Sequence, residues 1–259
     1  MSSCFLLHGQ RFSLLTFTTP AGIAQPGHAQ NESWFVYLEK GFLAVEDERG
    51  YWTVLPGRIG WMPPHFHYEI RAYGHVAGIC ASLTPLLCAG LPEIPSALAI
   101  SSLVAPILER AVTWQPDGVG GVFQPLPARQ ERLLQVLLDE LRYSSQGQAR
   151  LLLPKDKRLN YLAREILKNP GERRTVEEWA ERMRISSRSI SRHFSRETNM
   201  TFAQWRQNAS LIVAMKRLAE GESVREAARS VGYENVSAFI TSFKKAFGQT
   251  PAQFRQQFD

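Results

Sequence analysis

Hydrophobic and polar positions follow different patterns in the two halves of the chain. In the first 85 residues, short apolar runs rich in β-branched and aromatic residues predict strands at 36–38, 42–45, 51–55 and 59–62. Between them lie clusters typical of turns, at 39–41, 46–50, 56–57 and 63–64. Many short strands at close spacing predict a sandwich or a small barrel.

The pattern changes from Ser82 to Asp117, where apolar residues take up helical spacing. Leu103, Ile107, Leu108 and Ala111 share one face of a predicted helix. A leucine stripe follows in residues 130–143, formed by Leu133, Leu134, Leu137, Leu138 and Leu141. Leu133, Leu137 and Leu141 form either a dimer helix or a packing surface inside the domain, and we favour packing.

Residues 155–259 are predicted to be helical almost throughout. Stop signals occur at 169–171 (Asn-Pro-Gly), Gly221, Gly232 and Gly248, and Thr175 followed by Glu178 forms a capping box. The glycine- and proline-rich segment 118–127 has the composition of a linker. The fold class is therefore α+β and multidomain, with one domain in 1–150 and an all-α domain in 151–259.

The first of two stretches in this helical half that predict a helix-turn-helix unit is 176–194. Ala180 is the small residue that lets two helices approach. The buried set comprises Trp179, Met183, Ile185, Ile190 and Phe194. The free face of the second helix carries Arg188, Ser191, Arg192 and Glu197.

The second stretch, 224–243, repeats this design. Ala228 is the small residue and Gly232 occupies the turn. The buried set comprises Val231, Tyr233, Phe239 and Phe243, and the free face carries Ser237, Thr241, Lys244 and Lys245. The helix predicted at 201–218 between the two units would be about 27 Å long. Because one DNA turn is about 34 Å, the two second helices could enter successive major grooves.

Charge supports a polyanionic partner for the second half only. Residues 1–150 contain 10 Lys or Arg and 12 Asp or Glu, a balance of −2, whereas residues 151–259 contain 20 and 12, a balance of +8. Charge alone does not choose between nucleic acid and an anionic membrane face. The 3 cysteines form no metal pair or disulfide framework, and no signal peptide or membrane span is expected, so we expect a cytoplasmic protein.

Several segments of residues 175–255 resemble the AraC/XylS family of bacterial transcription regulators. The resemblance rests on TFAQWR at 201–206 and on SVREAARSVGYENVSAFITSFKKAFGQTPAQFR at 223–255. It implies a DNA-binding regulator, an activator of promoters that contacts RNA polymerase. Two positions depart from the family pattern: Ser210 where many members have arginine, and Ser187 in place of a common proline. Both departures could reduce phosphate contacts.

Side-chain chemistry assigns a role to each candidate DNA contact. Arg188 and Arg192 can donate two hydrogen bonds to a guanine edge, and Ser191, Ser237 and Thr241 can make short base or methyl contacts. Arg196, Arg206, Lys244 and Lys245 are expected to touch phosphates. The first unit would then carry most of the specificity, because its free face has two arginines.

Residues 28–75 resemble the small cupin domain of the shorter family members, on the strength of residues 49–53, Gly57, Pro63 and the strand that ends at Tyr37. Cupins often bind a metal through an HxH pair and a distant histidine. Here the pair reads His28-Ala29-Gln30 and the distant position is Tyr68, with His65 and His67 just before it. We expect no metal and no cofactor, and interpret His65 and His67 as loop or rim residues.

Aromatic residues are concentrated in this segment: Trp34, Tyr37, Trp52, Trp61, Phe66 and Tyr73. They either line a small-molecule pocket or fill a small core. For a pocket, the candidate ligand-binding residues are Trp34, Tyr37, Trp52, His65 and His67.

Three function classes remain at this point. We favour a transcription regulator that binds double-stranded promoter DNA and responds to a small-molecule effector. One alternative is a cupin metalloenzyme with an appended helical domain, against which the broken HxH pair argues. The other is a DNA-binding or interaction module whose first half only forms a homodimer. No catalytic triad, P-loop or paired-carboxylate pattern stands out in the sequence, so we expect no enzyme.

Overall fold

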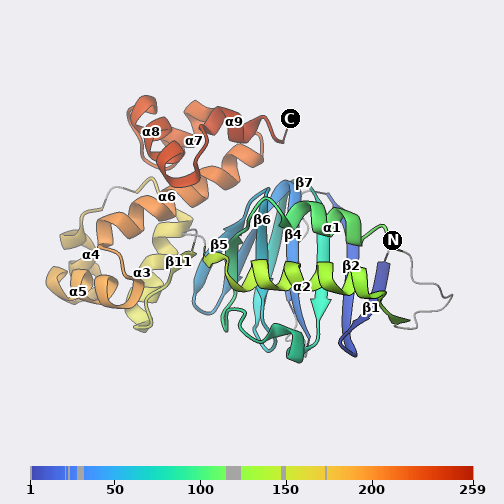
Figure 1. Ribbon diagram of the computed structural model, residues 1–259. Coiled ribbons are helices and arrows are strands. Elements are labelled where there is room, and N and C mark those ends of the chain that lie inside the picture. The colour runs from blue at the N-terminus through green and yellow to red at the C-terminus, as the bar shows by residue number, and fades with distance from the viewer. Residues whose placement is uncertain are drawn as a thin grey trace. The chain divides into compact units, whose positions relative to one another are not determined.

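The computed structural model describes residues 2–20, 22, 24–27, 32–114, 124–146, 150–172 and 174–258. The chain divides into two compact units (Figure 1). Unit 1 comprises residues 1–47 and 52–150, and unit 2 comprises residues 48–51 and 151–259.

Unit 1 is built around a mainly antiparallel sheet. Its strands are β1 (Ser2–Leu7), β2 (Gln10–Thr19), β3 (Ala24–Gly27), β4 (Ser33–Asp47), β5 (Gly50–Val54), β6 (Arg58–Met62), β7 (Tyr68–Leu83), β8 (Ser96–Ala99), β9 (Gln124–Pro125) and β10 (Ser145–Gln146). The strand order is β10-β8-β6-β4-β7-β2-β1-β9, while β3 pairs with β7 and β5 with β4. The β1–β9 pairing is parallel.

Two hydrophobic clusters of unit 1 contain alternate residues of strand β4. Phe35 and Tyr37 belong to one cluster, together with buried leucines of helices α1 (Val104–Ala111) and α2 (Ala128–Arg142). Val36 and Leu38 belong to the other cluster, together with Trp52. We call these the Phe35 cluster and the Trp52 cluster. Figure 1 shows α1 and α2 lying over one face of the sheet.

The predicted turn at residues 39–41 is wrong. The runs 36–38 and 42–45 belong to one strand, β4, whose pairing with β7 shifts register on both sides of Lys40. Gly41 has a φ of 68°, and a Cβ there would lie 2.9 Å from the His75 carbonyl oxygen. The glycine therefore serves a β-bulge, which bends a strand without ending it.

The remaining elements of unit 1 match the helical pattern in part. Helix α1 was expected to bury Leu103, but this residue precedes the helix and is 53% exposed. Strand β8 and the short helix η1 (Pro85–Cys88) lie in a segment for which we predicted only a change of pattern. Residues 118–123 of the expected linker and the pair at His28 and Gln30 lie outside the described residues.

Unit 2 is helical, as predicted. Its helices are α3 (Lys157–Lys168), α4 (Val176–Met183), α5 (Ser187–Thr198), α6 (Phe202–Ala219), α7 (Val224–Ser230), α8 (Val236–Phe247) and α9 (Pro251–Arg255). Capping boxes begin α4, α6, α7 and α9, including the predicted pair Thr175 and Glu178. The short strand β11 (Arg150–Leu152) precedes these helices, and the Leu153 N–H donates to the Arg49 carbonyl oxygen at 2.8 Å.

Helix α6 lies between two pairs of helices, α4–α5 and α7–α8, which we call the first and second helix pair. The first pair packs on α6 through Trp179, Ile190, Phe194 and Trp205, all nearly or fully buried. The second pair has an aromatic centre of its own, in which Phe243 contacts Phe239, Phe247 and Phe254. Within the described chain, no helix is both long and apolar enough to cross a membrane.

Candidate nucleic-acid interface

Helix α5 exposes the polar face that the sequence predicted. The residues Arg188, Ser191, Arg192 and Arg196 are exposed, while Ile190 and Phe194 of the same helix are completely buried. The Ser186 side chain caps the start of the helix by accepting a hydrogen bond from Ser189 N. Arg184, with a φ of 53°, ends α4 in the left-handed conformation. The turn between the two helices is thus short, and α5 presents its basic face to solvent.

Helix α8 has a comparable design with fewer charges. Ser237, Thr241, Lys244 and Lys245 are exposed, whereas Phe239 and Phe243 are fully buried. Asn235 caps the helix by accepting from the main-chain N–H groups of Ser237 and Ala238. The Thr241 hydroxyl donates to the Ser237 carbonyl oxygen at 3.0 Å, so its oxygen remains available as an acceptor.

Glu197 does not belong to the free face of α5, contrary to the sequence-based expectation. Its side chain is only 11% exposed and its Oε1 lies 3.0 Å from His193 Nδ1 and 2.9 Å from Arg196 Nη2. Its other oxygen accepts from the main chain of Lys155 and Asp156. Helical periodicity predicts only which side of α5 a residue lies on. The contact of Glu197 with Lys155 and Asp156 joins two segments more than 40 residues apart, so no local sequence pattern could reveal it.

Arg206 is engaged with the protein main chain. Its Nη1 donates to the Arg174 carbonyl oxygen at 2.6 Å, and its Nη2 donates to the Glu172 carbonyl oxygen. The phosphate contact expected for Arg206 stays a prediction. In the structure, the guanidinium binds the main chain of the segment that precedes α4. Ser210, on the same helix, is buried, so the position where many family members have arginine faces the protein interior here.

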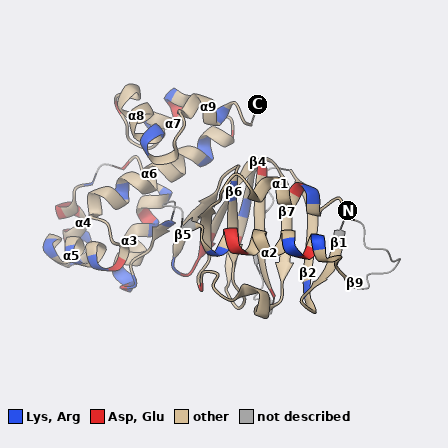
Figure 2. Cartoon of the chain, viewed as in Figure 1, with Lys and Arg blue, Asp and Glu red and all other residues tan. Residues whose placement is uncertain are grey.

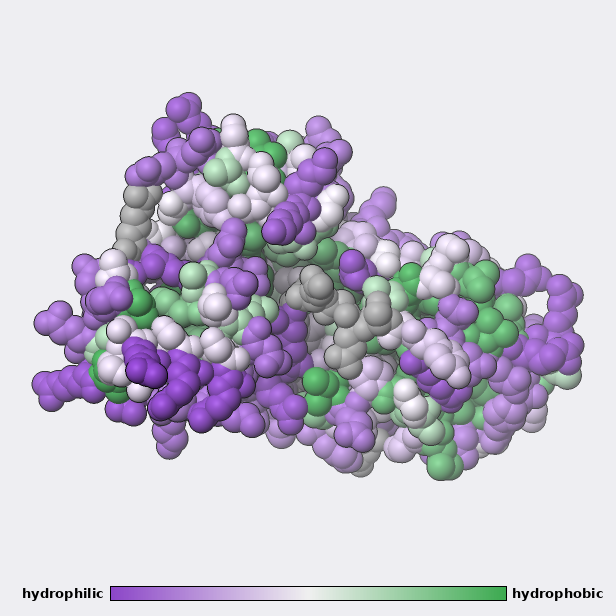
Figure 3. Space-filling model, turned by 60° about the vertical axis from the view of Figure 1, so that its left-hand side comes forward, coloured by the Kyte–Doolittle hydropathy of each residue, from purple (hydrophilic) through white to green (hydrophobic). Residues whose placement is uncertain are grey.

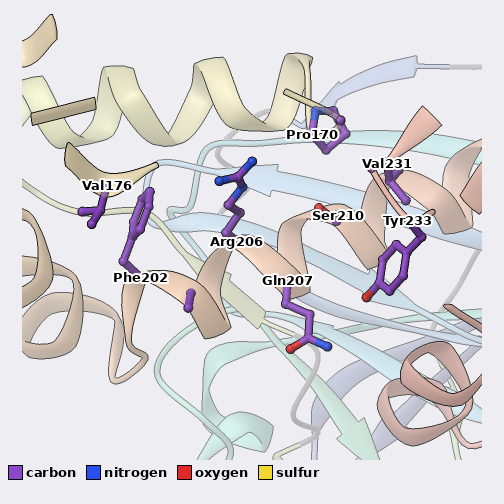
Figure 4. A pocket seen from close by; sticks show the side chains of 11 residues that line it. Pro170, Val176, Phe202, Arg206, Gln207, Ser210, Val231 and Tyr233 are labelled. Atoms are coloured by element: carbon purple, nitrogen blue, oxygen red, sulfur yellow. The ribbon is translucent and has the colours of Figure 1, made fainter. Parts of the chain in front are cut away.

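A crevice beside α6 is lined by residues from both helix pairs. Its volume is about 430 Å³, and the lining includes Pro170, Gly171, Arg206, Ser210, Gly232 and Tyr233. In Figure 4, Arg206 lies between Phe202 and Val176 on one side and Val231 and Tyr233 on the other.

The electrostatic character of unit 2 agrees with the charge count. Figure 2 shows Lys and Arg on several of its helices, including α5. On the face shown in Figure 3, its surface is mostly hydrophilic, with smaller green patches. A basic helical surface with polar side chains is chemically suited to phosphates and base edges.

In unit 1, the structure brings together part of the proposed ligand set. Trp34 packs half-buried against the Trp52 cluster, and its indole Nε1 donates to the Tyr68 hydroxyl at 2.7 Å. Burial raises the pKa of Tyr68, while the hydrogen bond with Trp34 acts the other way. Within the described residues, the buried Trp52 Nε1 has no hydrogen-bond partner. Tyr68 was singled out in the sequence only as a replaced histidine, and its contact with Trp34 was not foreseen.

The other members of that set lie elsewhere. Tyr37 belongs to the Phe35 cluster, so the structure does not place it with Trp34 and Trp52. His65 and His67 are exposed in the loop between β6 and β7, and His65 has a φ of 64°. Among the described residues, no group of three or more His, Cys, Asp or Glu side chains has the arrangement of a metal site.

Known proteins that are similar to this chain include helix-turn-helix transcription regulators. Residues 179–257 match the family described as helix-turn-helix domain. The chain is 28% identical over 236 residues to the HTH-type transcriptional regulator NimR of Escherichia coli, covering 90% of this chain and 82% of that protein. It is 30% identical over 102 residues to the HTH-type transcriptional regulator RipA of Corynebacterium glutamicum, covering 39% of this chain and 31% of that protein.

Other matches are local or remote. The bifunctional transcriptional activator/DNA repair enzyme AdaA of Bacillus subtilis is 32% identical over 105 residues, which cover 40% of this chain and 50% of that protein. The structure of ToxT from Vibrio cholerae aligns with 95% of this chain at 9% identity and a TM-score of 0.41, values too low to support an argument. From the domain match and the curated relatives, residues 179–257 carry a helix-turn-helix domain, and the chain is similar to HTH-type transcription regulators, in the case of NimR over most of its length.

Proposed function

We propose that this regulator binds duplex promoter DNA through two helix-turn-helix units, the first and second helix pairs, with α5 and α8 as recognition helices. The observation that carries the proposal is that each pair buries its aromatic or apolar side and exposes polar and basic residues on its second helix. Helix α6, with 18 residues, joins the two pairs over about 27 Å, close to the ~34 Å of one DNA turn.

Base reading is assigned mainly to α5. Arg188 and Arg192 are exposed and can each donate two hydrogen bonds to a guanine edge, with Ser191 between them. Helix α8 offers Ser237 and Thr241 for short contacts, and Lys244 and Lys245 for phosphates, as Arg196 does on α5. Specificity would therefore fall mostly on the half-site bound by α5.

Direct selection of bound fragments tests this function. The full-length protein is incubated with sheared genomic DNA, bound fragments are sequenced, and the best site is titrated at several salt concentrations. If about six phosphates are neutralised, the log–log slope of affinity against salt is about −5. Absence of enrichment together with no binding at low salt would refute DNA binding, whereas enriched sites upstream of genes identify the promoters controlled.

For unit 1 we propose a small-molecule effector site in a cupin-like sheet domain, with Trp34, Tyr68 and Trp52 as its residues. The support is the unpartnered indole N–H of Trp52 in the described structure, in the cluster against which the half-buried Trp34–Tyr68 pair packs; the ring centroids of that pair are 5.7 Å apart. A buried donor without a partner is costly. A planar, partly apolar ligand with one acceptor atom would satisfy it and stack on Trp34.

The proposal also covers where the protein acts and how it regulates transcription. We place the protein in the cytoplasm as an activator that contacts RNA polymerase and has no catalytic activity. A competing assignment, a cupin metalloenzyme, predicts a stoichiometric transition metal in the purified protein. Metal analysis after purification without chelators separates the two, since a bound metal at one equivalent would favour the enzyme.

A further inference from the structure

The loop between α3 and α4, residues 169–175, meets the second helix pair main chain to main chain. A Cβ added to Gly171 would lie only 2.7 Å from the carbonyl oxygen of Ser230, the last residue of α7. A Cβ on Gly232, whose φ is +89°, would lie 3.4 Å from the Gly171 Cα. Both glycines are therefore required where the loop touches the turn between α7 and α8.

Arg206 fastens the same loop to α6. Its guanidinium donates to the carbonyl oxygens of Glu172 and Arg174, both of which precede the Thr175 cap of α4. Burial lowers the pKa of Arg206, and the Glu172 carboxylate counteracts this effect. A planar guanidinium suits this role because it can hold two acceptors in a fixed geometry, which a lysine ammonium cannot do.

Helix α6 packs against both helix pairs, but the two pairs do not share one apolar centre. The apolar cluster under the first pair includes Trp179, Phe194 and Trp205 but none of the aromatic residues Phe239, Phe243 and Phe254. Beside Arg206 lies the open crevice of about 430 Å³ instead of packed side chains (Figure 4). An unfilled space does not resist movement of its walls, so on this side of α6 the contacts of the loop supply resistance that packed side chains do not.

We propose that Arg206 is a positioning residue that fixes the angle between α5 and α8, and with it the number of base pairs between the two half-sites. It does so by holding the loop on α6, which keeps Gly171 against Ser230. The inference rests on the proposed binding of DNA by both helix pairs. Each inserted base pair turns a half-site by about 35° and moves it by about 3.4 Å, so a rigid protein tolerates little change in spacing.

The test uses the full-length chain and variants of its best selected site with one or two base pairs added or removed between the half-sites. We expect the wild-type protein to lose about tenfold or more in affinity for each single-pair change, similar to a base mismatch. Arg206→Gln keeps a polar side chain but loses the double clamp, and we expect its spacing penalty to fall to about threefold or less.

Two further variants sharpen the result. Arg217→Gln is the matched control, because Arg217 lies on the same helix and pairs with Glu222 at 2.9 Å, so its spacing profile should equal that of the wild type. Gly171→Ala adds a Cβ that has to displace the Ser230 carbonyl, so we expect a different optimal spacing instead of a broader profile.

The outcomes distinguish a failure of the proposed function from a failure of the proposed role of Arg206. If the wild-type chain binds no duplex DNA, the proposed function fails. If the wild-type chain binds with a spacing preference that Arg206→Gln and Gly171→Ala leave unchanged, the positioning role is wrong. If Arg206→Gln lowers the affinity equally at every spacing, Arg206 is a phosphate contact or a general stabiliser, and the positioning role is again wrong. If Arg206→Gln fails to fold, Arg206→Lys and Gly171→Ala carry the test in its place.

Discussion

The carboxylate of Glu197 accepts a hydrogen bond from the main chain of Lys155, with 2.7 Å between Glu197 Oε2 and Lys155 N. The Asp156 N–H donates to the same oxygen at 3.4 Å, and Asp156 caps helix α3. The last turn of α5 is thus tied to the segment that begins α3. Burial alone would raise the pKa of Glu197, but hydrogen bonds from His193, Arg196 and the two main-chain groups lower it to about 2.

This pKa predicts a defined acid dependence of stability. Because the folded-state pKa of about 2 lies below the ordinary value of 4.5, the charged carboxylate stabilises the folded state above about pH 4.5, and this contribution is lost as the pH falls toward 2. Glu197→Gln should therefore be less stable than the wild type at neutral pH and lose less stability on acidification. Thermal melts followed by circular dichroism across this range measure the difference.

The control for this prediction is Glu181→Gln, since Glu181 is an exposed carboxylate on α4. Its melting temperature should follow the wild-type curve at every pH. If Glu197→Gln also follows that curve, the carboxylate is not held by the contacts described.

The two recognition helices should respond differently to substitution. Arg192→Ala should cost ~1–3 kcal/mol on the best site and relax the preference at one base position, because it removes a contact to a base edge. Lys244→Ala should weaken binding to all sequences about equally, because it removes a phosphate contact. Binding of both variants to a randomised site library shows the difference; indistinguishable profiles would mean that the assignment of base and phosphate contacts is incorrect.

Trp34 and Trp52, both assigned to the proposed effector site, should differ in how much each contributes to the stability of unit 1. Trp34→Ala should abolish the effector response and leave DNA binding in the absence of effector intact, because Trp34 is half-buried at the edge of the Trp52 cluster and lies in the other unit. Trp52→Ala should instead destabilise unit 1 by about 3–5 kcal/mol, since Trp52 is 1% exposed.

The measurement for this pair is the thermal shift of the full-length protein with a library of metabolites and drugs, together with reporter transcription. A bound effector raises the melting temperature and changes output by about 5–150-fold. Tyr68→Phe should reduce the response, because it removes the acceptor of the Trp34 N–H. If Trp34→Ala unfolds the protein as Trp52→Ala does, and no compound shifts the melting temperature, the aromatic residues are simply core.

The leucine stripe of α2 should behave as packing. Leu137 is completely buried in the Phe35 cluster, so Leu137→Ala should cost about 2–5 kcal/mol in the free energy of unfolding of unit 1. Val136 lies on the same helix at 43% exposure and serves as the control. Val136→Asp should leave the stability nearly unchanged. Light scattering measures the mass of both variants in solution. A mass below that of the wild type for Val136→Asp alone would show that the exposed face of α2 forms a dimer contact.

The helical half of this protein could be predicted closely because its signals are local. Thr175, Gly232 and Gly248 mark helix ends through a capping box or a left-handed φ, and these act within a few residues. The exposed faces of α5 and α8 followed from periodicity for the same reason. The ties made by Glu197 and Arg206 depend on which loop packs nearby, and no periodic pattern carries that information.

The sheet half was harder because strand pairing is non-local. Residues 39–41 resemble a turn in composition, yet the partner strand β7 continues past them, so the glycine forms a bulge in one long strand. Similarly, an aromatic-rich sequence does not reveal which ring faces which side. The register assigned Tyr37 to the Phe35 cluster and left Trp34 with Tyr68.

If unit 1 binds the proposed effector, strand β4 limits how the protein could acquire a new effector preference. From Phe35 to Leu38 all four residues are buried, and they alternate between the two clusters, so each substitution there disturbs packing on one side of the sheet or the other. Phe17, Tyr68 and Ile70 touch the Trp52 cluster while remaining half-exposed, so they can change size or polarity at smaller cost. Related regulators with different effectors should therefore vary at the positions of Phe17, Tyr68 and Ile70 and retain an apolar β4.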